Sequence, residues 1–204
     1  MTANFSSISC EMIVELIWLF LSLVTQILDV QQKILARILW FPQAALSIYV
    51  SSKKKLYGKA FYYIIASIIN AYAYIQWKGT KKIKPIQAVS RANPRILFRT
   101  VISSLVFVTL WTAFRKRTLD LPVVAIYFDT LYAVLGFLEK ILMSKKKLER
   151  WIFATTRYLL FTISCIKVNS LILALQSLAL GCISLYGQLQ WYMSYKKSRY
   201  CHMQ

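Results

Sequence analysis

The side chains best suited to chemistry are charged groups that interrupt long apolar runs of this sequence. Arg157 stands near the middle of one such run, and Glu15 and Asp129 stand near the ends of two others. Because a charge in an apolar environment is costly and normally faces an interior, these residues are candidates for binding. Three roles stay open for Arg157: binding an anionic ligand group, pairing with Asp129 or Glu15, or extending its long stem to a membrane surface.

The two acidic residues and two amide side chains in the apolar runs each have more than one possible role. Three kinds of role stay open for Asp129 and Glu15: to gate a path, to contact a cationic ring, or to cap or pack helices. Asn70 and Gln43 lie in the middle of other apolar runs and offer both donors and acceptors. Each amide therefore either reads the hydroxyl groups of a ligand or ties two helices together.

Aromatic side chains in the same runs present flat faces to a flat heterocycle, and a cationic ring would gain further from cation–π attraction. The candidates are Trp40, Tyr74, Trp151 and Tyr158. Trp77, Trp191 and Tyr192 lie beside basic clusters instead, where aromatic residues typically anchor a helix at the membrane interface. The lysine clusters themselves are expected to be solvated loop ends or contacts to anionic lipid.

Catalytic chemistry finds little support. The sequence has no HExxH motif, no group of histidines and only 7 Asp and Glu residues. Its four cysteines form no CxxC pair and no metal-binding spacing. We therefore expect no catalytic residue, no metal ion and no cofactor.

Composition indicates a membrane protein. Of 204 residues, 58% are hydrophobic and 16% are charged, whereas soluble domains are about 45–50% apolar. The net charge of +19 would suit a nucleic-acid-binding protein. However, the basic residues are confined to short clusters between apolar runs, as in the loops of membrane proteins. This pattern favours a lipid bilayer over nucleic acid as the partner.

The apolar runs predict an all-α protein with seven transmembrane helices, each about 20 residues long. They lie at about 11–28, 34–50, 57–77, 96–114, 123–142, 150–168 and 170–193. Alternate loops hold sixteen basic residues on one side of the membrane and eight on the other. The positive-inside rule then places the N-terminus outside and the C-terminus in the cytoplasm.

An internal repeat organises these runs. Residues 72–77 (Tyr-Ala-Tyr-Ile-Gln-Trp) recur 114 positions later as 186–191 (Tyr-Gly-Gln-Leu-Gln-Trp). The same offset relates Glu15 to Asp129, Lys33 to Lys147 and Ser22 to Gly136. Such self-similarity predicts two homologous units of three helices each.

Since three helices end on the opposite side from where they begin, a single linker helix must return the chain before the second unit. The predicted organisation is therefore 3+1+3, with parallel repeats as in the SWEET arrangement and a substrate between them. Its parts are an N-terminal tail (1–10), a first repeat (11–78), a basic loop and linker helix (79–122), a second repeat (123–193) and a basic cytoplasmic tail (194–204).

Several of these segments resemble the PnuC family of nicotinamide riboside and vitamin transporters. They are 70–77 (Asn-Ala-Tyr-Ala-Tyr-Ile-Gln-Trp), 128–130 (Phe-Asp-Thr), 145–151 (Lys-Lys-Lys-Leu-Glu-Arg-Trp) and 185–191. The resemblance runs from about Glu15 to Lys197. It implies a SWEET-like fold of seven helices, a homotrimer, and facilitated diffusion of a vitamin or vitamin precursor across a bacterial inner membrane.

One departure from the family bears on the cargo. The family's substrate motif reads Trp-x-x-Trp-x-x-x-Asn, and this chain keeps the first ring as Trp151 but has Ala154 and Tyr158 at the other two positions. Nicotinamide riboside, thiamine, riboflavin and a nucleoside therefore all remain as cargo. The alternative function is a vitamin-binding membrane subunit of an ATP-driven importer.

Overall fold

Seven helices make up nearly all of the part of the chain that the structure describes. The computed structural model describes residues 2–53, 57–83, 89–118, 123–167 and 171–201. The helices in these ranges are α1 (Thr2–Val30), α2 (Leu35–Lys53), α3 (Tyr57–Ile83), α4 (Pro94–Thr118), α5 (Val123–Ser144), α6 (Arg150–Lys167) and α7 (Leu171–Cys201). The only β pairing among the described residues is one isolated bridge between Ser90 and Lys147. The prediction of an all-α fold is confirmed.

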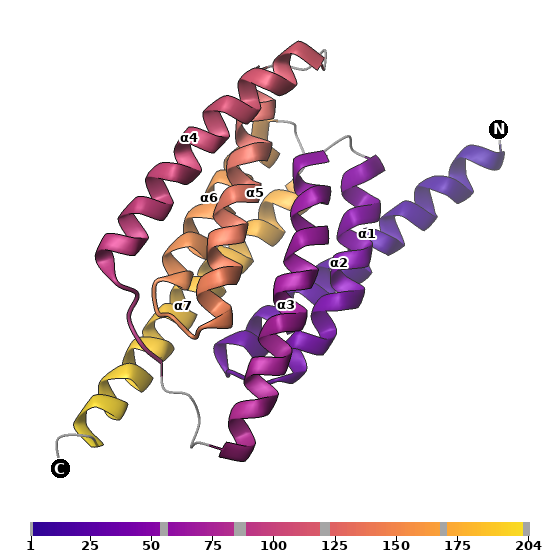
Figure 1. Cartoon of the computed structure of the whole chain (residues 1–204). Coiled ribbons are helices and arrows are strands. Elements are labelled where there is room, and N and C mark those ends of the chain that lie inside the picture. Colours follow the sequence, from indigo (N-terminus) through magenta and orange to yellow (C-terminus); the bar gives the residue numbers. More distant parts are fainter. Residues whose placement is uncertain (1, 54–56, 84–88, 119–122, 168–170, 202–204) are drawn as a thin grey trace.

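Some helix ends differ from the expected boundaries. Helix α1 already begins at Thr2, inside the range predicted as a tail, and α7 continues to Cys201, beyond the predicted end at 193. In Figure 1 the first part of α1 and the last part of α7 extend past the bundle at opposite ends. Both segments lengthen helices whose apolar portions were located from sequence.

Six helices form a closed ring. Successive neighbours in contact are α1 and α2, α2 and α3, α3 and α5, α5 and α6, α6 and α7, and α7 and α1. Helix α4 packs against α5 alone and lies on the outside of the ring (Figure 1). The interior is therefore bounded by α1–α3 on one side and α5–α7 on the other.

The turns that follow α1 and α5 have the same backbone geometry. Gln32 and Lys146 have positive φ values of 55° and 48°. After α1, Gln32 N–H donates to Asp29 and Lys33 N–H donates to Leu28; after α5, the bonds lie at the positions 114 residues later. This pattern is a Schellman motif, in which a residue in the left-handed region closes a helix. The two turns are thus equivalent in structure as well as in sequence.

The outer surface of the bundle is apolar. Large hydrophobic side chains remain exposed on every helix, among them Phe20 on α1, Ile68 on α3 and Leu189 on α7. Two helices, through Ile13–Val30 and Pro94–Phe114, are by themselves long and apolar enough to cross a membrane. In other helices the charged residues Glu139, Lys140 and Arg157 interrupt the apolar runs, and these three side chains are buried inside the bundle. An apolar outside around a polar inside is the arrangement that a bilayer favours.

Close packing of α7 against α6 depends on a glycine in α7. A Cβ atom added to Gly187 would lie 2.6 Å from the ring of Trp151, whose side chain is completely buried. The Trp151 ring also meets Trp191 edge to face, with centroids 5.5 Å apart. Because the ring is held on both sides, it has no room to retreat.

We expect Gly187→Ala to destabilise the protein by about 1–3 kcal/mol, because the added methyl overpacks the contact with Trp151. The measurement is the melting temperature of the detergent-purified protein. Gly181→Ala is the matched control in the same helix, since its added Cβ would lie 3.7 Å from Cβ of Tyr158, an ordinary contact distance. Equal melting temperatures for both variants would contradict the prediction.

Candidate functional site

Six of the buried charged side chains are at most 2% exposed. We call them the charge cluster: Asp29, Arg37, Glu139, Lys140, Arg150 and Arg157. Each of the two carboxylates is paired with two of the four cations. Buried charges of this kind are stable only when paired and hydrogen-bonded, so the geometry of each half matters.

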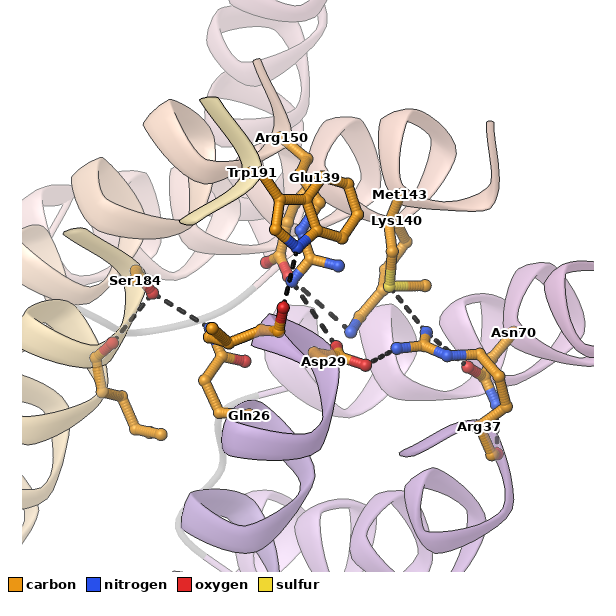
Figure 2. A network of polar contacts seen from close by, with 12 residues as sticks. Gln26, Asp29, Arg37, Asn70, Glu139, Lys140, Met143, Arg150, Ser184 and Trp191 are labelled. Carbon is orange, nitrogen blue, oxygen red and sulfur yellow. Dashed lines mark hydrogen bonds and ion pairs between the residues drawn. The ribbon is translucent and has the colours of Figure 1, made fainter. Parts of the chain in front are cut away.

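Asp29, at the end of α1, occupies the first half of the charge cluster. Its carboxylate forms an ion pair with Arg37 of α2, and its Oδ2 lies 3.5 Å from Nη2 of Arg150 at the start of α6. Arg37 is held further by α3, since its Nη1 donates to Oδ1 of Asn70 at 3.0 Å. Figure 2 shows Asp29 between the two guanidinium groups. This half therefore connects α1–α3 with α6.

Glu139 of α5 occupies the second half. Its Oε2 lies 2.8 Å from Nη2 of Arg157, and its Oε1 lies 3.7 Å from Nζ of Lys140. Arg157 also donates from Nη1 to the hydroxyl of Tyr62 on α3 at 2.7 Å. The sequence offered Asp129 or Glu15 as the acid that pairs with Arg157. That choice was wrong, because Glu139 on the neighbouring helix is the partner.

Buried aromatic rings line the cations. Lys140 Nζ lies 3.6 Å from the ring centre of Trp40, and the Arg150 guanidinium lies 3.9 Å from that of Trp151. Arg157 lies 4.7 Å from the ring centre of Tyr158. Cation–π attraction is strongest where both groups are desolvated. The interior therefore combines cations with flat aromatic surfaces.

Most of the predicted binding residues meet in this interior. Trp40, Gln43, Asn70, Trp151, Arg157 and Tyr158 are all buried. Asn70 also donates from Nδ2 to the carbonyl oxygen of Arg37 at 2.8 Å, so it ties α2 to α3. The side-chain oxygen of Gln43 has no partner in the part of the chain that the structure describes. Of the two amides, Gln43 is therefore the one with spare hydrogen-bonding capacity.

Two predicted residues lie apart from the charge cluster. Asp129 is half-buried near the start of α5, and its Oδ1 accepts a hydrogen bond of 3.0 Å from the backbone N–H of Lys59 in the first turn of α3. This contact caps α3 from a neighbouring helix. Tyr74 is half-buried near the end of α3, with Lys78 Nζ 5.7 Å from its ring centre.

The sequence misplaced several residues at helix ends. Trp77 and Trp191 were expected to anchor the membrane interface, yet both are buried, and Trp191 Nε1 donates to the carbonyl oxygen of Val30 at 3.1 Å. Arg37, Arg150 and Lys146 were counted among the loop bases, yet they are buried as well. These residues lie next to loops in the sequence, so they were expected at the surface. In the structure, the side of each helix that faces the interior continues to the helix end.

Two grooves lie outside this interior. One of about 420 Å³ runs between α1 and α7, past Ile27 and Tyr186. Another of about 640 Å³ runs along α6 and α7, past Ile152 and Leu189. None of the predicted site residues lines either groove. The charge cluster and its aromatic lining are therefore the stronger candidate for a binding site.

Comparison with known proteins accounts for this architecture. Residues 12–193 match the family model described as nicotinamide mononucleotide transporter. The chain belongs to this transporter family. The resemblance found in the sequence is confirmed, and the chain is a multi-pass membrane transporter rather than an enzyme.

The fold of this transporter is similar to that of a solved structure, described as the crystal structure of the vitamin B3 transporter PnuC. The TM-score is 0.68, and the match covers 93% of this chain and 88% of that chain at 20% sequence identity. Comparison with curated proteins found no match. At this identity the likeness concerns the fold, so the choice of cargo has to be argued from this transporter's own residues.

We expect Glu139→Gln and Arg157→Met each to lower the melting temperature of the purified transporter, because breaking a buried ion pair costs about 3–5 kcal/mol. The double variant should lose less than the sum of the two single losses, since it leaves no unpaired charge between these residues. Arg99→Met, which removes an exposed cation from α4, serves as the control. Additive losses would show that Arg157 and Glu139 are not coupled.

Proposed function

We propose that this chain carries a vitamin or vitamin precursor with a flat heterocycle through the space between α1–α3 and α5–α7. The proposal follows the names of similar proteins: the family model is that of a nicotinamide mononucleotide transporter, and the solved structure is that of a vitamin B3 transporter. The observation that carries it is the polar, aromatic interior inside an apolar ring. Nicotinamide riboside, thiamine, riboflavin and nucleosides are the cargo candidates.

The proposal includes the 3+1+3 organisation. Helices α1 and α5 end 114 residues apart, at Val30 and Ser144, and α3 and α7 begin 114 residues apart, at Tyr57 and Leu171. The equivalent turns and the position of α4 outside the ring also support two three-helix units with a linker. In transporters built from such repeats, cargo binds between the units.

Trp40 is the strongest candidate for a stacking surface. It lies 114 residues before Ala154, the position at which this chain lacks the second Trp of the family motif. Trp40 is buried and stacks on Tyr63, with ring centres 5.6 Å apart. The ammonium nitrogen of Lys140 also lies 3.6 Å from its ring centre. The first unit therefore provides the ring that the second unit lacks, and a cationic heterocycle would suit the same face.

Further parts of the proposal follow from the family and from charge. A bacterial inner membrane, a homotrimer, facilitated diffusion and a cytoplasmic C-terminus remain predictions. Four of the basic residues assigned to loops are buried, namely Arg37, Lys59, Lys146 and Arg150. Without them, the loops on the predicted cytoplasmic side still hold more basic residues than the loops on the other side. The ATP-driven subunit receives no support from the comparisons, which name a transporter.

Uptake by the purified protein in liposomes tests this function. The labelled compounds are nicotinamide riboside, thiamine, riboflavin and a deoxynucleoside, supplied without ATP. We expect saturable uptake of one of them down its concentration gradient. Absence of uptake of all four, with protein-dependent uptake appearing only when an ATP-hydrolysing partner is added, would contradict the proposal.

We expect Trp40→Ala to weaken cargo binding about tenfold or more, because stacking on an aromatic ring contributes roughly 1–3 kcal/mol. Trp40→Phe should retain most of the affinity. Trp111→Ala is the control, since Trp111 lies on the exposed side of α4. Calorimetric titration with the transported compound measures the affinities, and an unchanged value for Trp40→Ala would place the stacking surface elsewhere.

A further inference from the structure

The groove of about 640 Å³ along α6 and α7 changes from apolar to charged along its length. On α7 its lining runs from Leu185 through Leu189 to Tyr192, a rise of about 10 Å along the helix axis. Arg91, which also lines the groove, lies beyond Tyr192, since its guanidinium carbon is 5.7 Å from the ring centre of Tyr195. The groove therefore begins among apolar side chains and ends at a cation.

Backbone contacts on both sides of Arg91 hold it at this end of the groove. Ser90 forms two backbone hydrogen bonds of 3.2 and 3.0 Å with the turn between α5 and α6. Ala92 N–H donates to Oε2 of Glu149 at 2.9 Å. Lys147 Nζ donates to the carbonyl oxygen of Arg91 at 3.1 Å. In Figure 1 the segment before α4 passes beside α7. The position of Arg91 thus does not depend on an ion pair of its own.

The charge around this end of the groove is positive. The Arg91 guanidinium is exposed and forms no ion pair with any residue that the structure describes. Lys147 lies beside it, and Lys196 follows Tyr192 by one turn on the same face of α7. Among the described lining residues Glu149 is the only acid, and one of its oxygens is already used by a backbone N–H. Three cations therefore stand near one acid, and a bound anion would improve the balance.

A phospholipid has the same order of groups as this groove. Its acyl chains are apolar and would lie along Ile152 and Leu189, both exposed, while its anionic phosphate would lie near Arg91. The outer face of the bundle is the face that meets the bilayer, and Tyr192 is exposed on it, as is typical of tyrosines at the membrane interface. Basic side chains at that level attract anionic lipids.

Two features of the molecule narrow the choice of occupant. The groove between α1 and α7 has no charged residue in its described lining, so it could hold an acyl chain but would not select a headgroup. A second copy of the chain would bring its own basic loops to the same membrane level, because copies in one membrane share one orientation. Like charges at one level repel each other, whereas an anionic headgroup is attracted.

We propose that this groove binds an anionic phospholipid and that Arg91 recognises its phosphate group. The inference goes beyond the transport function, since it concerns the outer surface of the bundle and requires no cargo. The lipid would connect the segment before α4 with α6 and α7. It would therefore stabilise the folded protein, because a ligand that binds only the folded state raises the melting temperature.

Two lipids with the same acyl chains and different headgroup charge test the inference. They are dioleoyl phosphatidylglycerol, which is anionic, and dioleoyl phosphatidylcholine, which is neutral overall, and each is added to the full-length protein in detergent. Native mass spectrometry measures the binding, and thermal unfolding measures the stabilisation. We expect the anionic lipid to bind at least about tenfold more tightly and to raise the melting temperature more. Equal binding and equal stabilisation by the two lipids would overturn the inference.

Arg91→Gln locates the headgroup. We expect it to lower the affinity for the anionic lipid about tenfold, because the phosphate loses a charge-assisted donor. Arg91→Lys keeps the charge but loses the fork of donors, so a smaller loss is expected. Arg99→Gln is the matched control, since it removes an exposed cation from α4. Equal losses in Arg91→Gln and Arg99→Gln would mean that only the overall positive charge attracts lipid, which would overturn the inference.

Leu189→Trp tests the apolar part of the groove. The larger side chain would fill the space of an acyl chain, so the affinity for the anionic lipid should fall. Ile68→Trp, at an exposed apolar position on α3, is the control and should leave that affinity unchanged.

Two further outcomes would contradict the inference. Glycerol 3-phosphate has a phosphate but no acyl chains, and if it stabilised the protein as much as the lipid does, the apolar groove would have no part in binding. If Arg91→Gln and Leu189→Trp changed the oligomeric state and left lipid binding unchanged, the groove would be an interface between copies of the chain.

Discussion

Two buried carboxylates, each shared by two buried cations, are the interaction on which this structure depends. Asp29 joins α1 to α2 and α6, while Glu139, through Arg157, joins α5 to α6. In a low-dielectric interior such pairs are strong only when the helices hold them at short range, and an unmatched charge is expensive. The ring must therefore bring these helices close together, and small residues such as Gly187 allow that approach.

The two three-helix groups share their frame but not their interior chemistry. The turns closed by Gln32 and Lys146 are equivalent, and the helix ends keep the same offset. Positions that carry charge in one group are neutral in the other: Asp29 corresponds to Met143, Glu139 to Thr25 and Arg157 to Gln43. The backbone geometry of the turns and helices depends on local hydrogen bonds, so it is kept even though these side chains differ between the two groups. The interior between the groups is therefore asymmetric, with Trp40 on one side and most of the cations on the other.

Aromatic rings and cations form one system in this interior. Lys140, Arg150 and Arg157 each lie over a buried ring, so the charges are stabilised by π-faces as well as by carboxylates. Cation–π attraction thus adds to the ion pairs of these three residues.

The sequence by itself determined the helical class, seven apolar runs, the repeat and the family. These features are local: apolar runs set helix lengths, and the 114-residue offset needs no knowledge of packing. It also identified Arg157 and Trp151 as interior residues, since both lie within apolar runs. Only the tertiary structure decided which charges meet. Asp29 and Arg150 are 121 residues apart, and a base at the end of a helix can point to water or inward. The sequence of the helix end is the same whether the base points to water or inward. Only the packing of the neighbouring helices decides between the two orientations.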